Sequence, residues 1–305
     1  MEGTTVLEHA IAVSAALAGA VFTAIGIVVR QRATMDVPDG KALSGIMLST
    51  LVRRPLWWIG TGAAVIGYAF QALALAYGSI ILVAPLLVSA LLFALPLSAR
   101  LAGRRVERSD WGWALLLTVG LAVFVALART KPGDYEGTEG SAVLVAAGSA
   151  VAVIGCVAAA TRFKDWRGAL LLAIGVGVLF GVVAVLTKIV MHFVTAGHTT
   201  TLLTTPLPYM LIAAAVVATL LQQSAFHAGS LQTSVPAMLV LEPIVAVLLG
   251  QVVLGEHLMV SRASAVVLGV AVLAMAIATI ALGRDEGAYE DELEAAARRR
   301  GTRST

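Results

Sequence analysis

Long apolar runs dominate the chain and are separated by short polar stretches. Nine of these runs have about the 20 residues that a helix needs to cross a bilayer. They are residues 7–29, 56–77, 79–99, 111–128, 141–160, 168–193, 207–228, 231–254 and 262–283. None shows the alternation of polar and apolar residues that is typical of a β-barrel strand. The pattern predicts an all-α polytopic membrane protein with about nine transmembrane helices.

Composition supports this prediction, and the positions of the basic residues predict the orientation. Hydrophobic residues make up 59% of the 305 positions, charged residues only 13%, and the mean hydropathy is +0.92. One side of the predicted membrane carries 17 of the 21 Lys and Arg residues, in segments 30–54, 100–110, 161–167 and 284–305. Because basic residues concentrate in cytoplasmic segments, we expect a plasma-membrane protein with its N-terminus outside and its C-terminus in the cytoplasm. The net charge of +3 follows from this topology and does not indicate a nucleic-acid partner.

Two parts of the chain resemble each other. Residues 55–85 and 206–236 align without gaps, and 10 of the 31 aligned positions are identical. The distinctive matches are Pro55/Pro206, Gln71/Gln222, Gly78/Gly229, Ser79/Ser230 and Pro85/Pro236. At a slightly different offset, residues 19–30 align with residues 177–188. The first four predicted helices therefore form one repeat and the last four form another.

A single helix between two four-helix repeats gives the repeats opposite orientations in the membrane. The predicted organisation is a first repeat at 1–130, a connecting helix 5 with its loops at 131–167, a second repeat at 168–283 and a cytoplasmic tail at 284–305. Inverted repeats are typical of secondary transporters, because two related halves can expose a central site to either side in turn. A duplicated structural membrane protein would have the same architecture, so function has to be argued from the polar residues.

Glu242 lies about halfway along the predicted helix 231–254 and is directly followed by Pro243. A charged group at that depth costs about 2.5 kcal/mol or more, so it needs a partner, a proton or a function. Pro243 cannot donate a backbone hydrogen bond, which predicts a local kink or a freed carbonyl beside the carboxylate. We interpret Glu242 as a binding site for a proton or a cation. The alternative is a protonated or hydrogen-bonded glutamate in a structural kink.

Four further polar residues in the predicted spans are candidates for substrate or ion binding. Gln71 and Gln222 are equivalent in the two repeats and, with Gln223, are expected to line a polar site. Amide hydrogen bonds between packed helices are the alternative interpretation. Lys188 lies towards the outer end of its helix, where its long side chain either extends to the membrane surface or pairs with Glu242.

Glycine and proline residues mark the expected hinges. Gly78 and Gly229 each precede a serine and predict tight turns between antiparallel helices. Pro85 and Pro236 fall about two turns into the helices that follow, where paired kinks would act as hinges.

No motif indicates catalysis, a metal or a cofactor. The sequence has no phosphate-binding loop, no HExxH and no CxxC, and its single cysteine, Cys156, lies inside a predicted helix. His192 and His227 have no acidic or thiolate neighbour at the spacing of metal ligands. We therefore expect no enzyme and no resident cofactor. Any pumping must use an ion gradient or the gradient of the substrate.

The second repeat resembles a known transporter family. The run LVLEPIVAVLLGQVVLGEHL, residues 239–258, follows a Gly-Ser pair. It is similar to the EamA-type repeat of the drug/metabolite transporter superfamily, in which a proline-containing helix leads into an LGE loop. The first repeat, in its Trp57-Trp58 pair and its VAPL run, is similar to the NIPA-type branch, which is linked to magnesium transport. The acidic pattern occurs only in the second repeat, because Leu91 and Arg105 stand at the equivalent positions of the first.

The leading hypothesis is a secondary transporter that moves a small organic solute across the plasma membrane by alternating access. The first alternative is a transporter of magnesium or another divalent cation, for which one membrane carboxylate supplies few of the oxygen ligands that Mg²⁺ prefers. The second is a non-transporting membrane scaffold or partner subunit. The expected partners are the lipid bilayer and a small-molecule or cation substrate. A homodimer is compatible with the sequence, which does not decide the oligomeric state. Glu256, at the outer end of its helix, is expected to be a capping or topological residue at little cost.

Overall fold

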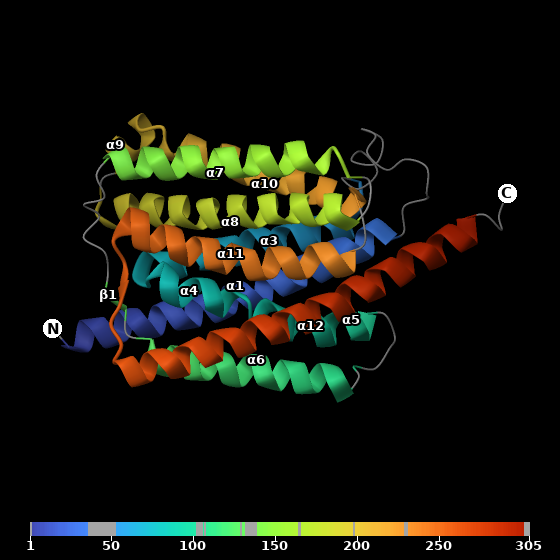
Figure 1. The fold of residues 1–305 in the computed structure, drawn as a ribbon, viewed down its shortest axis with the longest axis horizontal. Helices are drawn as coiled ribbons and strands as arrows, with labels where there is room; N and C mark the ends of the chain where they lie inside the picture. Colours follow the sequence, from blue (N-terminus) through green and yellow to red (C-terminus); the bar gives the residue numbers. More distant parts are fainter. Residues whose placement is uncertain are drawn as a thin grey trace.

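The protein is a bundle of long helices that lie roughly along one direction (Figure 1). The computed structural model describes residues 2–35, 53–101, 106, 108–128, 130–131, 139–163, 166–197, 199–228 and 231–301. The helices are α1 (Glu2–Met35), α3 (Pro55–Tyr77), α4 (Ile80–Leu87), α5 (Ala90–Leu101), α6 (Arg108–Leu127), α7 (Glu139–Ala160), α8 (Trp166–Thr195), α9 (Thr199–Thr204), α10 (Leu207–Ala228), α11 (Leu231–Leu254) and α12 (Arg262–Gly301).

The helices confirm an all-α polytopic membrane protein. Within the described residues, seven helical stretches are long and apolar enough to cross a membrane, and one of them is formed by α4 and α5 together. Two further helices, α7 and α10, contain shorter apolar segments at Ala146–Ala160 and Leu207–Gln222. Each of the nine predicted runs coincides with helical structure, whereas a count of nine membrane crossings remains a prediction.

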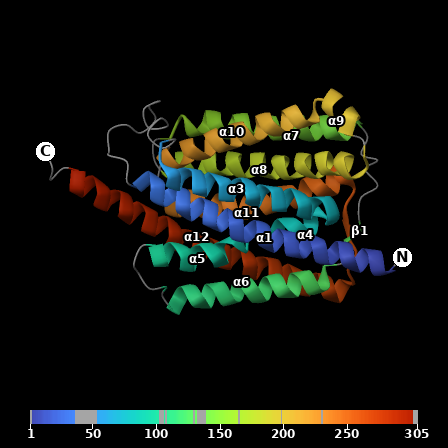
Figure 2. The same cartoon turned by 180° about the vertical axis from the view of Figure 1, so that it is seen from behind.

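The two ends of the bundle differ. At one end the short strands β1 (Thr130–Lys131) and β2 (His257–Leu258) pair in antiparallel fashion, and the N-terminus lies at this same end (Figures 1 and 2). We call it the β-ladder end. At the opposite end α12 continues as a helix beyond the bundle towards the C-terminus. The predicted tail therefore begins within the helix that forms the last span.

Close packing within each half depends on glycines that bring backbones together. A Cβ added at Gly26 of α1 would lie 2.8 Å from the backbone nitrogen of Ala64 in α3. In the second half, a Cβ at Gly177 of α8 would lie 2.8 Å from Leu241 Cβ in α11, and one at Gly181 would meet Val245 in the same way. Small residues at helix contacts allow this approach in membrane proteins, where dispersion between packed atoms replaces the hydrophobic effect as the driving force.

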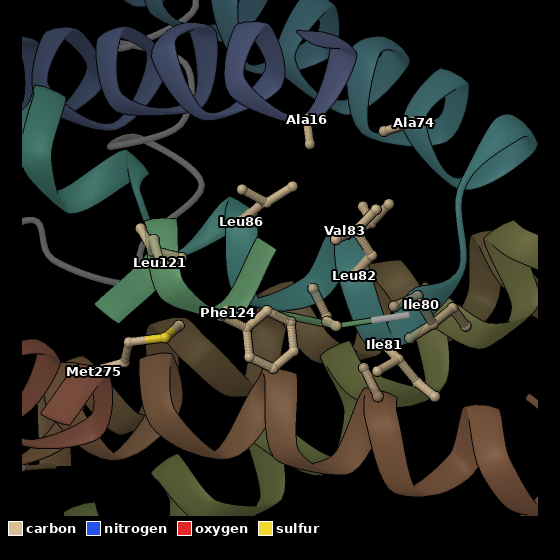
Figure 3. Packing of buried hydrophobic residues seen from close by; sticks show 14 of the residues in the cluster. Ala16, Ala74, Ile80, Ile81, Leu82, Val83, Leu86, Leu121, Phe124 and Met275 are labelled. Atoms are coloured by element: carbon tan, nitrogen blue, oxygen red, sulfur yellow. The ribbon is translucent and has the colours of Figure 1, made fainter. Parts of the chain in front are cut away.

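The short helix α4 occupies the centre of the largest apolar cluster. Its residues from Ile80 to Leu86 are buried, and α1 and α3 lie on one side of them, where Ala16 and Ala74 face Leu86 and Val83 (Figure 3). Phe124 of α6 and Met275 of α12 belong to the same cluster. Elements of both halves therefore surround α4.

The third predicted span is broken in the middle, and the corresponding span of the second half is continuous. Pro85 has no N–H to donate, and after it Val88 N–H donates to Pro85 O at 3.2 Å and Ser89 N–H to Leu86 O at 3.0 Å. Both bonds run from residue i to residue i−3, as in a 3₁₀ turn, and not to residue i−4 as in an α-helix. The α-helix α4 therefore ends here, before α5 begins. By contrast, α11 runs without interruption through Pro236 and Pro243. The structure therefore shows a break after Pro85 and none within α11.

Candidate functional site

Glu242 lies on the side of α11 that faces α8 and α10. Four residues before it, Met238 is 4% exposed and packs in a small cluster with Ala173 of α8 and Ala225 of α10. Four residues after it, Ala246 is fully buried. Residues four apart share a helix face, so the Glu242 side chain projects towards the interior of the second half.

The position of Glu242 along α11 can be measured from the β-ladder end. Gly250 of α11 lies against Ile80 at the start of α4, because a Cβ added to it would be 3.4 Å from Ile80 Cβ. Glu242 lies a little more than two helical turns from Gly250, which is about 12 Å along the helix axis towards the middle of the bundle. Half of the hydrocarbon core of a bilayer is about 15 Å thick, so a membrane boundary near Gly250 would place the carboxylate close to the midplane, as the sequence predicts.

Glu242 makes no hydrogen bond or ion pair with any residue in the described part of the chain. Its side chain is half-buried. An ionised carboxylate at this depth would lack the compensation that buried charges normally have. A carboxylate in this environment is stable as the neutral acid or with a cationic ligand.

Gln222 lies beside the same apolar cluster on which the Glu242 segment of α11 packs. It precedes Ala225 by three residues on α10, and its neighbour Leu221 packs on the cluster that contains Met238. Gln222 is half-buried and, like Glu242, has no hydrogen-bond partner among the described residues. The side chain of Gln223 lies outside the described residues. The second half thus provides a carboxylate and at least one amide around a single apolar cluster.

Gln71 lies elsewhere, in the first half. Its backbone nitrogen would be 3.3 Å from a Cβ added to Gly19, so this part of α3 packs directly on α1. The side chains three and four residues later, Ala74 and Leu75, belong to the large cluster around α4. The two glutamines that are equivalent in sequence are therefore placed beside different clusters.

Lys188 neither extends to the membrane surface nor pairs with Glu242. It is 8% exposed, and its Nζ donates to Leu75 O and to Gly78 O, both at 2.6 Å. These carbonyls belong to the C-terminal end of α3, which has no intrahelical partners for its last carbonyl groups. A cation there also complements the negative end of the helix dipole. Lys188 is therefore a C-terminal cap supplied by the other half of the protein.

Glu256 caps the helix that begins immediately after that break. Its Oε1 accepts from Ile80 N–H at 3.1 Å and its Oε2 accepts from Ile81 N–H at 3.3 Å. Ser79 adds a further cap, since its Oγ accepts from Leu82 N–H at 3.3 Å. The prediction that Glu256 is a capping residue is confirmed. The expectation that it costs little is wrong, because its side chain is only 1% exposed.

The environment of Glu256 has opposing effects on its ionisation. Burial raises the pKa of Glu256 above its ordinary value, whereas the Ile80 N–H, the charge of Lys188 and the Ile81 N–H each lower it. These three interactions thus offset part of the cost of burying the carboxylate. Lys188 and Glu256 act on each other through this charge interaction and bind separate backbone groups.

A left-handed glycine places the Glu256 carboxylate. Gly255, which follows the last residue of α11, has a φ of 66°. This conformation reverses the chain, so that Glu256 N–H donates to Gly250 O at 3.2 Å and the side chain turns towards α4. Only glycine adopts such a φ without appreciable steric cost. The LGE run is therefore a structural unit in which glycine supplies the turn and glutamate supplies the cap.

Asp110 and Ser89 are among the buried polar residues that were not singled out from the sequence. Asp110, in the first turn of α6, is 3% exposed, and it was missed because the apolar run begins one residue later. Ser89, at the break between α4 and α5, is 2% exposed, and its Oγ has no hydrogen-bond partner in the part of the chain that the structure describes. The proline four residues earlier was the available signal for that break.

Comparison with known proteins identifies a family. An uncharacterized protein of Corynebacterium glutamicum is 39% identical over 278 residues, which are 91% of this chain and 96% of the relative. The chain belongs to the family of this corynebacterial protein. No family model and no solved structure matches it. The match extends over 91% of the chain and carries no assigned activity, so function has to be argued from the site.

Proposed function

We propose that the protein is a secondary transporter that moves a small organic solute across the plasma membrane by alternating access. The observation that carries this proposal is Glu242, a half-buried carboxylate near the midplane that has no partner among the described residues. Intramembrane ionisable groups mark substrate, ion or proton pathways in membrane proteins. Glu242 would bind the proton or the cationic group of the solute, with Gln222 and Gln223 as polar lining beside it.

The helix packing supports two inverted repeats. In the first half α1 packs on α3 and on the broken span α4–α5, and in the second half α8 packs in the same way on α10 and on α11. The connecting helix α7 packs against α8 and α11. In each half the first helix is the common neighbour of the next two, as the sequence repeat predicts. Such halves can rock against each other around a central site.

The same proposal assigns orientation and superfamily. The β-ladder end, with the N-terminus, is assigned to the outside, because the described helix ends that border the basic segments lie at the other end. Membership of the drug/metabolite transporter superfamily is proposed on the LGE run that carries the resemblance; in this chain that run ends one helix and caps another.

Flux measurements in proteoliposomes test the proposal. A panel of labelled organic cations, metabolites and neutral solutes is offered with and without an imposed pH gradient. At least one solute is expected to accumulate, and Glu242→Gln is expected to reduce coupled flux at least tenfold while the protein stays folded. Glu8→Gln, which changes an exposed carboxylate near the start of α1, is the matched control. Wild-type coupled flux in the Glu242→Gln protein would contradict the assignment.

The same assay separates the two alternatives. Uptake of Mg²⁺ that depends on Glu242 would indicate a divalent-cation transporter. No group of three or more His, Cys, Asp or Glu residues that could hold a metal occurs in the described parts of the chain. A scaffold or partner subunit predicts no flux of any solute, with or without Glu242.

A further inference from the structure

We propose that Lys188 and Glu256 form the latch of an outer gate, which holds the β-ladder end of the transporter closed and is released when the site opens to the outside. This inference rests on the proposed transport function. Its geometric basis is that both charged groups belong to the second half and bind only backbone groups at one break in the first half.

The two charged groups belong to one packed body. Lys188 is on α8 and Glu256 directly follows α11, and these helices interlock where Leu241 meets Gly177 and Val245 meets Gly181. A relative movement of the halves would therefore withdraw both groups together.

The groups that they bind belong to a second body. The end of α3 and the start of α4 are joined through Gly78 and Ser79, and α3 packs closely on α1. A Cβ at Gly78 would be 2.6 Å from Ala12 Cβ, which shows how firmly the break lies on α1. The latch therefore connects two bodies and contributes little to the packing inside either one.

The chemistry of the contact suits reversible opening. Lys188 satisfies carbonyl groups and Glu256 satisfies N–H groups, and water can replace both at an end of the bundle that reaches the aqueous phase. A dry apolar contact offers no such replacement. Tyr68 and Thr187 add a further polar contact between α3 and α8, with their hydroxyl oxygens 2.7 Å apart.

The inner end cannot carry the same latch. In the internal repeat the position equivalent to Lys188 is Arg30, but the position equivalent to Glu256 is Arg105. A second cation cannot accept hydrogen bonds from a helix N-terminus. The inner end therefore has to close by other contacts.

Thiol labelling tests the latch without any transport measurement. In a Cys156→Ala background, Ile80→Cys places a thiol at a buried position that faces Gly250 across the two bodies. A membrane-impermeant thiol reagent is added from outside to cells, and the rate of modification is measured. We expect slow labelling in the otherwise unchanged protein and at least tenfold faster labelling with Lys188→Met or Glu256→Ala. Leu203→Cys, which is 69% exposed on α9, controls for access and expression.

A charge exchange distinguishes capping from an ordinary ion pair. The double variant Lys188→Glu, Glu256→Lys would restore a simple pair, but it would place a carboxylate against carbonyls and an ammonium group against N–H groups. We expect this double variant to label as fast as the single variants. Slow labelling in it would overturn the capping latch, and so would slow labelling in both single variants once they are shown to be folded.

Cross-linking keeps the inference falsifiable if the charge variants do not fold. A Cβ on Gly250 would be 3.4 Å from Ile80 Cβ, close to the separation in a disulfide, so Ile80→Cys with Gly250→Cys is expected to cross-link under mild oxidation. The cross-linked protein should lose at least 90% of solute flux and regain it on reduction. Unchanged flux in the cross-linked protein would overturn the gate. If no solute is transported at all, the proposed function fails, and the labelling result alone decides the latch.

Discussion

Lys188 and Glu256 bind opposite sides of one helix break. The ammonium group of Lys188 is 2.6 Å from the carbonyl oxygen of Gly78, and the Glu256 carboxylate is 3.1 Å from the nitrogen of Ile80. A cation at the end of one helix and an anion at the start of the next each complement a helix dipole. The break can therefore be buried among apolar residues, where backbone groups without partners would cost several kcal/mol each.

Removing the Lys188 charge should destabilise the fold. Lys188→Met leaves two buried carbonyls and the Glu256 carboxylate without their cation, and we expect a loss of about 3–5 kcal/mol. Unfolding in mixed detergent and SDS micelles measures it. Lys188→Arg keeps the charge and donors and should lose less than half as much. Equal losses for Met and Arg would show that side-chain shape, and not hydrogen bonding, determines the effect.

Alanine substitutions of the two serines at the ends of α4 should change the free energy of unfolding in opposite directions. Ser79 caps α4 through Leu82 N–H, so Ser79→Ala should lower the free energy of unfolding by about 1 kcal/mol. The Ser89 hydroxyl is buried without a partner, so Ser89→Ala removes an unsatisfied polar group and should raise it, by up to about 1 kcal/mol. The same unfolding assay compares them. A clear loss for Ser89→Ala would indicate a hydrogen bond to water or to a ligand.

The positive φ of Gly255 predicts that substitutions at this position lower stability to different extents. Gly255→Ala should lower the free energy of unfolding by about 1–2 kcal/mol, because alanine is strained at positive φ. Gly255→Asn should lose less, since asparagine tolerates the left-handed region better. Differential scanning fluorimetry of the purified variants would rank them. Asparagine at least as damaging as alanine would contradict the role of φ.

Gly181 should not accept a methyl group. A Cβ there would be 2.6 Å from Val245 Cγ1 and 3.1 Å from the backbone nitrogen of Ala246, so Gly181→Ala must push α8 and α11 apart. Overpacking of this kind costs about 1–3 kcal/mol. Gly62→Ala in α3 is the matched control, because nothing lies within 4 Å of its added Cβ, and it should be neutral or stabilising. If Gly62→Ala lowered the free energy of unfolding as much as Gly181→Ala, the cause would be an effect on the helix backbone and not the contact between α8 and α11.

Local sequence pattern was sufficient to predict the helices and to select one candidate site residue. Apolar runs of membrane length form helices because each backbone group in lipid needs a partner within its own segment, which requires no knowledge of the rest of the fold. Glu242 could be selected in the same way, since a carboxylate in the middle of such a run is costly wherever its neighbours lie. The Gly-Ser pair at 78–79 likewise predicted the end of one helix and the start of the next.

The partners of the charged residues could not be predicted in this way. An ion pair between Lys188 and Glu242 was considered because both residues belong to the same repeat. Lys188 instead binds carbonyls at the end of a helix in the other repeat, 113 and 110 positions away. Glu256 appeared to be a surface residue because it ends an apolar run, but Ile80, 176 positions earlier, is packed over it. Whether the end of a helix meets water or protein depends on what lies beyond it in space.

The sequence by itself determined that this protein is a helical membrane bundle with an acid near the centre of one span, because helix length and the cost of a charge in lipid are local properties. Only the tertiary structure decided which acid caps a helix and which has no partner among the described residues. Hydrogen bonds require their two groups within about 3 Å, and the packing of α8 and α11 against α3 and α4 provides that proximity to Lys188 and Glu256 but not to Glu242.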